Sequence, residues 1–188
     1  RLGTEAASGL AREVVGVTDP ALRLRGVERR FRRGRGVGPI DLEVATGDRH
    51  AIDGPSGCGK STLLAVIAGL DRADRGSIEI GGRCVDHIPV GRRDLGLIEQ
   101  HLPLYEHLDG RANVAMAVSG LDITRAEADR RITEAIDLAD ARPLADRRAG
   151  TLSGGERARV CLARILARRP AVALLDESEV HYHLGEAL

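Results

Sequence analysis

The chain has 188 residues, of which 43% are apolar, 30% are charged and only 2% are aromatic. Its 28 basic residues balance its 28 acidic ones, which excludes a strong global field that would attract nucleic acid or an anionic membrane. The length and composition are typical of one globular domain, with a core built from aliphatic side chains.

The cysteines at 58, 84 and 161 are far apart and lack metal-ligand spacing, as is usual in a reducing compartment. No apolar run is long enough to span a bilayer, and no secretory signal is recognisable. We therefore expect a cytoplasmic protein that does not itself cross a membrane.

Residues 1–19 show no sustained periodicity, so we predict a tail or linker there and a folded domain over 20–188. Alternation of apolar with charged residues then predicts half-buried strands. A continuous apolar run that ends in acidic residues predicts one parallel strand buried on both faces. The predicted strands are 22–27, 40–44, 49–53, a hairpin of 77–80 and 83–85, 95–98 and 171–175.

Helical spacing predicts helices over 61–70, 124–139 and 153–168. Ser153 and Glu156 form a capping-box pattern at the start of the third helix. This order predicts an α/β domain: a mixed sheet core with N-terminal antiparallel strands and an inserted helical subdomain over about 101–151.

A basic stretch lies between the first two predicted strands. It comprises Arg29, Arg30, Arg32, Arg33 and Arg35. Because the chain is rich in arginine throughout, we interpret this stretch as a solvated loop rather than a phosphate-binding patch.

A glycine-rich loop joins the predicted strand 49–53 to the helix 61–70. Its residues are Gly54, Pro55, Ser56, Gly57, Cys58, Gly59, Lys60, Ser61 and Thr62, and they match the phosphate-loop pattern at every fixed position. Glycines let backbone N–H groups turn toward phosphate oxygens, and the positive end of the following helix points at them. Lys60 is the only lysine of the chain, and a compact ammonium fits between two phosphates better than a planar guanidinium. We predict that Lys60 reaches the β and γ phosphates and that Ser61 binds Mg²⁺.

Asp176 and Glu177 end the apolar strand 171–175. A carboxylate at the tip of a buried strand beside a phosphate loop is suited to hold Mg²⁺, and a second one beside it is suited to polarise the attacking water. Acidic pairs also occur at ordinary solvated strand ends. The phosphate loop is what favours the catalytic interpretation here.

A third motif, Leu152-Ser153-Gly154-Gly155-Glu156, is followed by Arg157-Ala158-Arg159-Val160. With the two motifs above, it resembles the LSGGQ signature of ABC-type ATPases, with Glu156 in place of the commoner Gln. The resemblance covers about residues 21–177 and implies a P-loop NTPase fold of the ABC type, with ATP and Mg²⁺ as cofactors. It also implies a dimer in which the signature residues Ser153, Gly154, Gly155 and Glu156 meet the γ-phosphate bound to the opposite subunit.

The resemblance also assigns individual roles. Phe31 stands where the family places an aromatic ring that stacks on adenine, and Gln100 matches the glutamine that contacts Mg²⁺ and senses the membrane subunit. The implied metal ligands are thus Ser61, Gln100 and Asp176. The implied catalytic residues are Lys60, Gln100 and Glu177.

Several further stretches resemble the ATPases of importers for sugars, polyamines, sulfate or molybdate. They are Pro89, 93–96, 105–108 and 113–114. The resemblance implies a second nucleotide-binding subunit, separate transmembrane permease subunits and a substrate-binding protein as partners, with no nucleic acid. It places the protein on the cytoplasmic face of the cell membrane.

Beyond Glu177 the family pattern stops. Residues 178–188 form an unpatterned tail without the D-loop and H-loop, so we expect the C-terminal strands to be missing through a frameshift, truncation or partial sequence. One alternative is a truncated or regulatory ABC protein that binds nucleotide without hydrolysis. A chromosome-maintenance ATPase is disfavoured, because the interval from Gln100 to Leu152 is short and lacks heptads.

Overall fold

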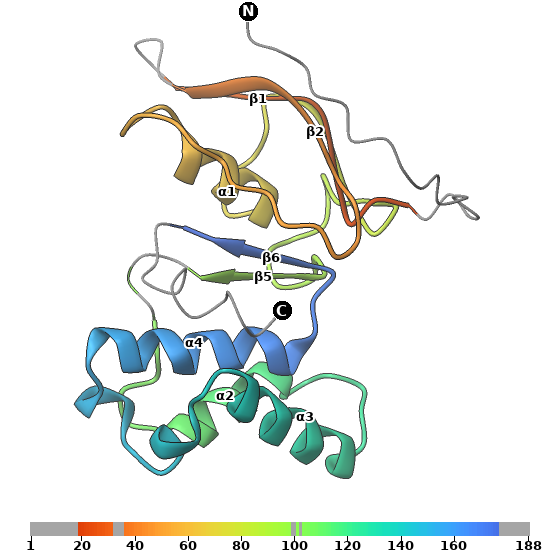
Figure 1. Ribbon diagram of the computed structural model, residues 1–188. Helices are drawn as coiled ribbons and strands as arrows, with labels where there is room; N and C mark the ends of the chain where they lie inside the picture. Colours follow the sequence, from red (N-terminus) through yellow and green to blue (C-terminus); the bar gives the residue numbers. More distant parts are fainter. Residues whose placement is uncertain (1–18, 32–35, 99–100, 102, 177–188) are drawn as a thin grey trace, which may run out of the picture.

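The computed structural model describes residues 19–31, 36–98, 101 and 103–176. Figure 1 shows layers stacked in the order antiparallel sheet, helix α1, a pair of parallel strands, helix α4, and the helices α2 and α3. In chain order the elements are β1 Leu22–Arg30, β2 Gly36–Val44, α1 Lys60–Ala68, β3 Arg75–Ile80, β4 Arg83–Cys84, β5 Leu95–Ile98, α2 Gly110–Val118, α3 Arg125–Leu138, two 3₁₀ turns at Arg142–Leu144 and Ala149–Thr151, α4 Gly154–Arg168 and β6 Val172–Leu175.

The first sheet is antiparallel, with strand order β2-β1-β3-β4. Leu24 of β1 lies opposite Ile78 of β3, and both are almost completely buried. Alternate side chains of a strand share one face, so these two positions pack together on the inner face against Val66 and Ile67 of α1. The predicted N-terminal antiparallel strands are thus confirmed, and α1 covers the sheet.

The strands β5 and β6 pair in parallel, from Leu95 opposite Val172 to Ile98 opposite Leu175. Leu174 belongs to the core around α1, whereas Ile98 belongs to the core around α4. Figure 1 shows the two strands between these helices. The predicted parallel strand is confirmed over Val172–Leu175, but the predicted burial on both faces is wrong: Leu174 is buried, whereas Ala173 is exposed. The reason is that, among the described strands, β6 has only β5 as a neighbour.

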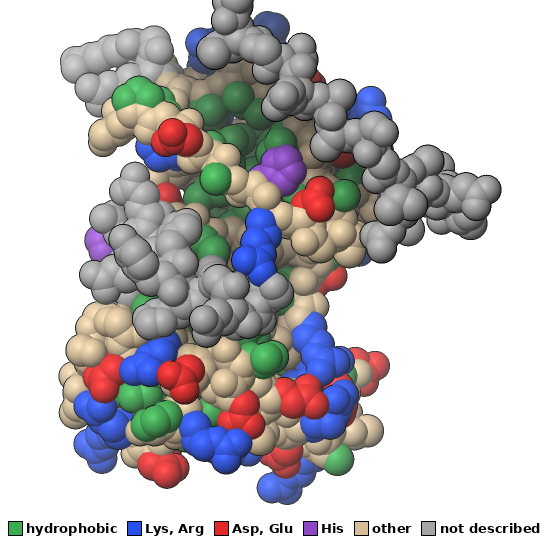
Figure 2. Space-filling model, viewed as in Figure 1, with side chains coloured by type: hydrophobic (Ala, Val, Ile, Leu, Met, Phe, Trp, Pro, Cys, Tyr) green, Lys and Arg blue, Asp and Glu red, His purple; other side chains and the backbone are tan. Residues whose placement is uncertain are grey.

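The helices α2, α3 and α4 enclose the second core, to which Val114, Ile136 and Leu162 contribute. Asn113, which is fully buried, ties the loop before α2 to this core. Its amide group donates to the carbonyl oxygen of Tyr105 at 3.1 Å and accepts from the Tyr105 N–H at 2.8 Å. Charged side chains of both signs are interspersed over the visible face of these helices (Figure 2). Among the described helices, none has both the length and the apolarity that a bilayer crossing demands.

One predicted strand is wrong. Residues 49–53 are not a strand, and Ile52 in their middle is 41% exposed. A strand requires hydrogen bonds to a neighbour, and the described strands pair only as β2-β1-β3-β4 and β5-β6. The sequence analysis also missed α2. The predicted tail, 1–19, is described only at Asp19, and residues 178–188 lie outside the described part.

The C-terminal end of α1 is held by the buried guanidinium of Arg93, which is only 6% exposed. Its Nη1 donates to the carbonyl oxygens of Val66 and Ile67 at 3.0 and 2.8 Å, and its Nε donates to that of Ile88 at 2.9 Å. The last carbonyls of a helix lack partners within the helix and carry its negative dipole end. Arg93 therefore supplies both the hydrogen bonds and the charge that this end requires.

We expect Arg93→Met to lower the free energy of unfolding by about 2 to 4 kcal/mol, because the two buried hydrogen bonds to Val66 and Ile67 and the part-buried one to Ile88 are lost. The matched control is Arg92→Met at the exposed neighbouring position, which should change the unfolding free energy by less than about 0.5 kcal/mol. Urea unfolding of the three proteins measures the difference. Equal stabilities for the two variants would contradict this role of Arg93.

Candidate nucleotide site

The phosphate-loop residues run from Gly54 to the first turn of α1. Gly57 and Gly59 adopt φ angles of 80° and 106°, which L side chains rarely reach. Gly59 also lies against β2: a methyl group there would come within 3.0 Å of the Gly36 carbonyl oxygen and of the Val37 Cβ. Gly57 is therefore favoured by the backbone turn, and Gly59 both by the turn and by its packing on the antiparallel sheet.

The side chain of Lys60 folds back over this loop. Its Nζ donates to the carbonyl oxygens of Gly54 at 2.7 Å and of Pro55 at 3.3 Å. The only lysine of the chain thus lies above the loop whose backbone N–H groups the sequence analysis assigned to phosphate.

Ser61 and Asp176 meet at the start of α1. The Ser61 hydroxyl lies 3.1 Å from Oδ1 of Asp176, and the Asp176 N–H donates to the Ile98 carbonyl at 3.0 Å, which continues the β5–β6 pairing by one residue. The structure therefore brings together two of the three predicted Mg²⁺ ligands. They are hard oxygen donors, which is the ligand type that Mg²⁺ prefers.

These residues fit a magnesium nucleotide. Among the described residues no group of three or more His, Cys, Asp or Glu side chains is placed to hold a metal. A metal here would be held by Ser61, Asp176, water and phosphate oxygens, which is the usual way in which proteins bind Mg²⁺ with phosphates. The ammonium of Lys60 and the N-terminal end of α1 supply positive charge to the same place.

The signature residues form the start of α4. Ser153 is the N-cap, its N–H donates to Oε2 of Glu156 at 2.8 Å, and its hydroxyl accepts from the Glu156 N–H at 3.4 Å. The capping box predicted from sequence is confirmed. The helices α1 and α4 lie on opposite sides of β5 and β6 (Figure 1), so the signature and the phosphate loop belong to different layers of the same chain.

The carboxylate of Glu156 is held in its ionised form. The Ser153 backbone N–H, then its hydroxyl and the guanidinium of Arg147, lower the pKa of Glu156 below its usual 4.5. Arg147 also donates to the Thr151 carbonyl at 3.1 Å, so it links the 3₁₀ turn before α4 to the cap. The signature motif of this chain thus ends in a carboxylate with its own counter-ion.

Phe31 follows directly after β1 and is 42% exposed. The guanidinium of Arg29 lies 4.8 Å from the centre of the Phe31 ring. Arg29 itself forms ion pairs with Asp71 and Asp74 at 3.0 and 2.9 Å. The interpretation of the basic stretch as a solvated loop is therefore wrong for Arg29 and Arg30, which lie within β1 and have acidic partners. The other three arginines of the stretch, Arg32, Arg33 and Arg35, lie outside the described residues.

The predicted residues Gln100 and Glu177 lie outside the described residues, so their roles stay predictions. The sequence analysis missed the contributions of Arg147, Asp71 and Asp74. No local pattern marks these three, since each acts through a residue 9 to 45 positions away.

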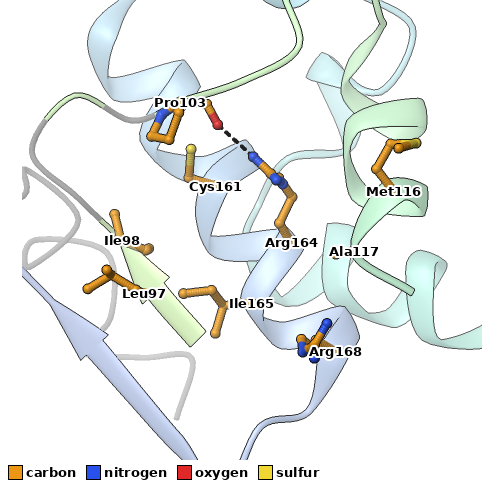
Figure 3. A pocket seen from close by; sticks show the side chains of 9 residues that line it. All are labelled: Leu97, Ile98, Pro103, Met116, Ala117, Cys161, Arg164, Ile165 and Arg168. Carbon is orange, nitrogen blue, oxygen red and sulfur yellow. Dashed lines mark hydrogen bonds between the residues drawn. The ribbon is translucent and has the colours of Figure 1, made fainter. Parts of the chain in front are cut away.

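A separate hollow of about 270 Å³ lies between β5, α2 and α4. Figure 3 shows Arg164 reaching the carbonyl of Pro103, at 2.6 Å, near Cys161, with Met116 on the facing helix α2. Burial raises the pKa of the Cys161 thiol to about 11, so this thiol is inert at neutral pH. None of the phosphate-loop or signature residues lines this hollow, and it is not the nucleotide site.

The cap of α4 gives a pH-dependent prediction. Because folding lowers the pKa of Glu156, its ionic contribution to stability is complete above the unfolded-chain value of about 4.5 and is lost as the pH falls through the lower folded value. We expect the stability difference between the parent chain and Glu156→Gln to be constant between about pH 7 and 5 and to shrink below about pH 4.5. Chemical unfolding at each pH measures it. An exposed carboxylate outside the cap supplies the control variant, Asp146→Asn, and an identical pH trend for both variants would contradict the assignment.

The sequence profile of the ABC transporter family matches residues 37–179. The chain is 44% identical over 138 residues to the sn-glycerol-3-phosphate import ATP-binding protein UgpC 3 of Rhizobium etli, which covers 73% of this chain and 40% of the relative. It is 42% identical over 167 residues to the spermidine/putrescine import ATP-binding protein PotA of Frankia alni, with 86% of this chain and 36% of the relative covered. The sulfate/thiosulfate import ATP-binding protein CysA of Thermosynechococcus vestitus is 40% identical, with 83% and 46% covered.

Solved structures agree on the fold. The dimeric post-hydrolysis structure of the ATP-binding cassette MJ0796, bound to ADP and Pi, superposes with a TM-score of 0.69 at 26% identity, covering 82% of this chain and 73% of that one. CbiO1 of Clostridium perfringens, part of the ABC transporter complex cbiONQ, superposes with a TM-score of 0.72 at 24% identity, covering 85% and 66%.

The chain spans less than half the length of the curated relatives named above. The profile match nevertheless covers well over half of this chain and includes the phosphate loop, the signature and Asp176. These comparisons agree with the local geometry of all three motifs, and the chain accordingly belongs to the ABC transporter family.

Proposed function

We propose that this chain is the ATP-binding part of an energy-coupling subunit of an ABC importer, which binds MgATP and, in its complete form, hydrolyses it. The observation that carries the proposal is the convergence of Lys60, Ser61 and Asp176 at one end of α1. The relatives' names, which describe import ATP-binding proteins, support the direction of transport.

Each residue contributes through its charge or its donor atoms. Lys60 neutralises the charge that develops on the β and γ phosphates, and backbone N–H groups of the phosphate loop orient the phosphate oxygens. Ser61, Asp176 and Gln100 hold the magnesium, which when bound neutralises and orients the phosphates. Glu177 orients the attacking water, and Phe31 stacks on the base.

The proposed active unit is a homodimer with two nucleotides. Each nucleotide lies between the phosphate loop of one subunit and the signature residues of the other. The separation of α1 and α4 by the β5–β6 layer supports this arrangement, because it leaves the signature of the same chain on the other side of the strands. The proposed partners are transmembrane permease subunits and a substrate-binding protein, which would place the subunit at the cytoplasmic face of the membrane.

The interval between the predicted Gln100 and the signature disfavours a chromosome-maintenance ATPase. It contains α2 with 9 residues and α3 with 14, joined by short connections, which is far too little for a long coiled coil. The other alternative, a protein that binds nucleotide without hydrolysing it, would have the same described contacts at the site. A measurement of phosphate release from ATP distinguishes it from the proposed enzyme.

Because Lys60 is the only lysine of the chain, chemical modification of a lysine side chain measures how accessible this one ammonium is. We expect MgATP to protect Lys60 from acetylation by a mild amine reagent, read by mass spectrometry of the peptide. Tripolyphosphate with Mg²⁺ should also protect, since the contacts are to phosphate, whereas adenosine should not.

Two variants of Lys60 test its chemistry. Lys60→Met should weaken MgATP binding by about ten- to a hundredfold, the range expected for a lost hydrogen bond to a charged group. Lys60→Arg keeps the charge and separates it from shape; we expect it to bind weakly as well, because a planar guanidinium is a poorer match than a compact ammonium for the space between two phosphates. In the acetylation experiment described above, a folded parent chain whose Lys60 is modified at the same rate with and without MgATP would contradict the proposed site.

A further inference from the structure

Phe31 follows the end of β1 that lies near the start of α1, although the two are far apart in sequence. It follows Arg30, which pairs with Gly36 of β2, and the Gly36 carbonyl oxygen is one of the atoms that leave no room for a side chain at Gly59. Lys60 comes next in the chain. The end of the β1–β2 pair therefore lies directly against the start of α1.

One face of the Phe31 ring is covered by Arg29. The guanidinium lies over the ring, 4.8 Å from its centre, which is within the range of a cation–π contact. With 42% of Phe31 exposed, ring surface away from Arg29 remains open to a flat partner. One face of the ring is thus covered by the guanidinium, and the rest of the ring is available for stacking.

The guanidinium is held in place by two carboxylates that follow α1. Its Nε donates to Asp71 at 3.0 Å and its Nη1 to Asp74 at 2.9 Å, and the other oxygen of Asp74 accepts the Arg30 N–H at 2.6 Å. The Asp74 N–H in turn donates to the Glu28 carbonyl at 2.8 Å. A fork of donors that engages two carboxylates fixes the guanidinium plane better than a single ammonium would.

We propose that Arg29, held by Asp71 and Asp74, is a positioning residue that fixes the Phe31 ring as a stacking surface for the base of the nucleotide. The inference rests on the proposed function, since it presumes that the phosphate loop holds the nucleotide's phosphates. Fixing the ring before the base arrives removes the entropic cost of ordering it on binding. Arg29 thereby acts on base affinity without contacting the phosphates.

The test compares two ligands on the purified chain: MgATP, which has a base, and magnesium tripolyphosphate, which lacks one. Arg29→Met should weaken MgATP binding by about three- to tenfold, in line with the strength of a cation–π contact and of side-chain ordering, and should change tripolyphosphate binding by less than about twofold. Arg29→Lys should restore part of the ATP affinity. The matched control is Arg25→Met at an exposed position of the same strand, which should leave both affinities unchanged.

A double-mutant cycle separates positioning from a general structural effect. Phe31→Ala should lose ATP affinity selectively, and adding Arg29→Met to it should cause no further loss, because there is no ring left to position. The inference is overturned if Arg29→Met weakens both ligands equally, if it weakens neither, or if its effect persists without Phe31. A folded parent chain that binds neither ligand overturns the proposed function, and the inference with it.

Discussion

The contact between the Ser61 hydroxyl and the Asp176 carboxylate joins residues 115 positions apart at 3.1 Å, and the candidate site depends on it. It exists only because β6 runs parallel to β5 between two apolar cores and ends at the N-terminal turn of α1. Leu174 packs into the core on one face of β6, and Leu175 packs against the core on the other. These two contacts fix the position of Asp176, which is the next residue. The position of the proposed magnesium ligand is thus set by aliphatic packing.

The helix α1 is the other half of this arrangement, and it is held at both ends. Its start packs on β2 at Gly59, where a side chain would be both strained and crowded. Its end is closed by Arg93, and the residues that follow it carry the carboxylates that bind Arg29. A shift of α1 would therefore displace the Lys60 ammonium and the Phe31 ring together, which couples the predicted phosphate and base subsites through one rigid element.

Local patterns in the sequence predicted what is locally determined: the phosphate loop, the helix after it, and the cap of α4 at Ser153. Residues 49–53 show why other elements were missed, because an apolar alternation becomes a strand only when a neighbour is present to pair with it. The helix α2 was missed because Val114, Met116 and Val118 alternate as they would in a strand; its best signal was Asp109, whose carboxylate caps the Ala112 N–H at 2.7 Å. Arg29 was misjudged because its partners, Asp71 and Asp74, lie 42 and 45 residues away.

The central claim is that Ser61 and Asp176 form the protein's share of a magnesium site beside the phosphate loop. The most direct measurement is the affinity of the chain for ATP with Mg²⁺ and with a chelator, in the parent and in Asp176→Asn, which keeps the shape of the side chain and removes its charge. The account predicts that Mg²⁺ strengthens ATP binding in the parent and that this gain is largely lost in the variant. A gain of the same size in both proteins would contradict it.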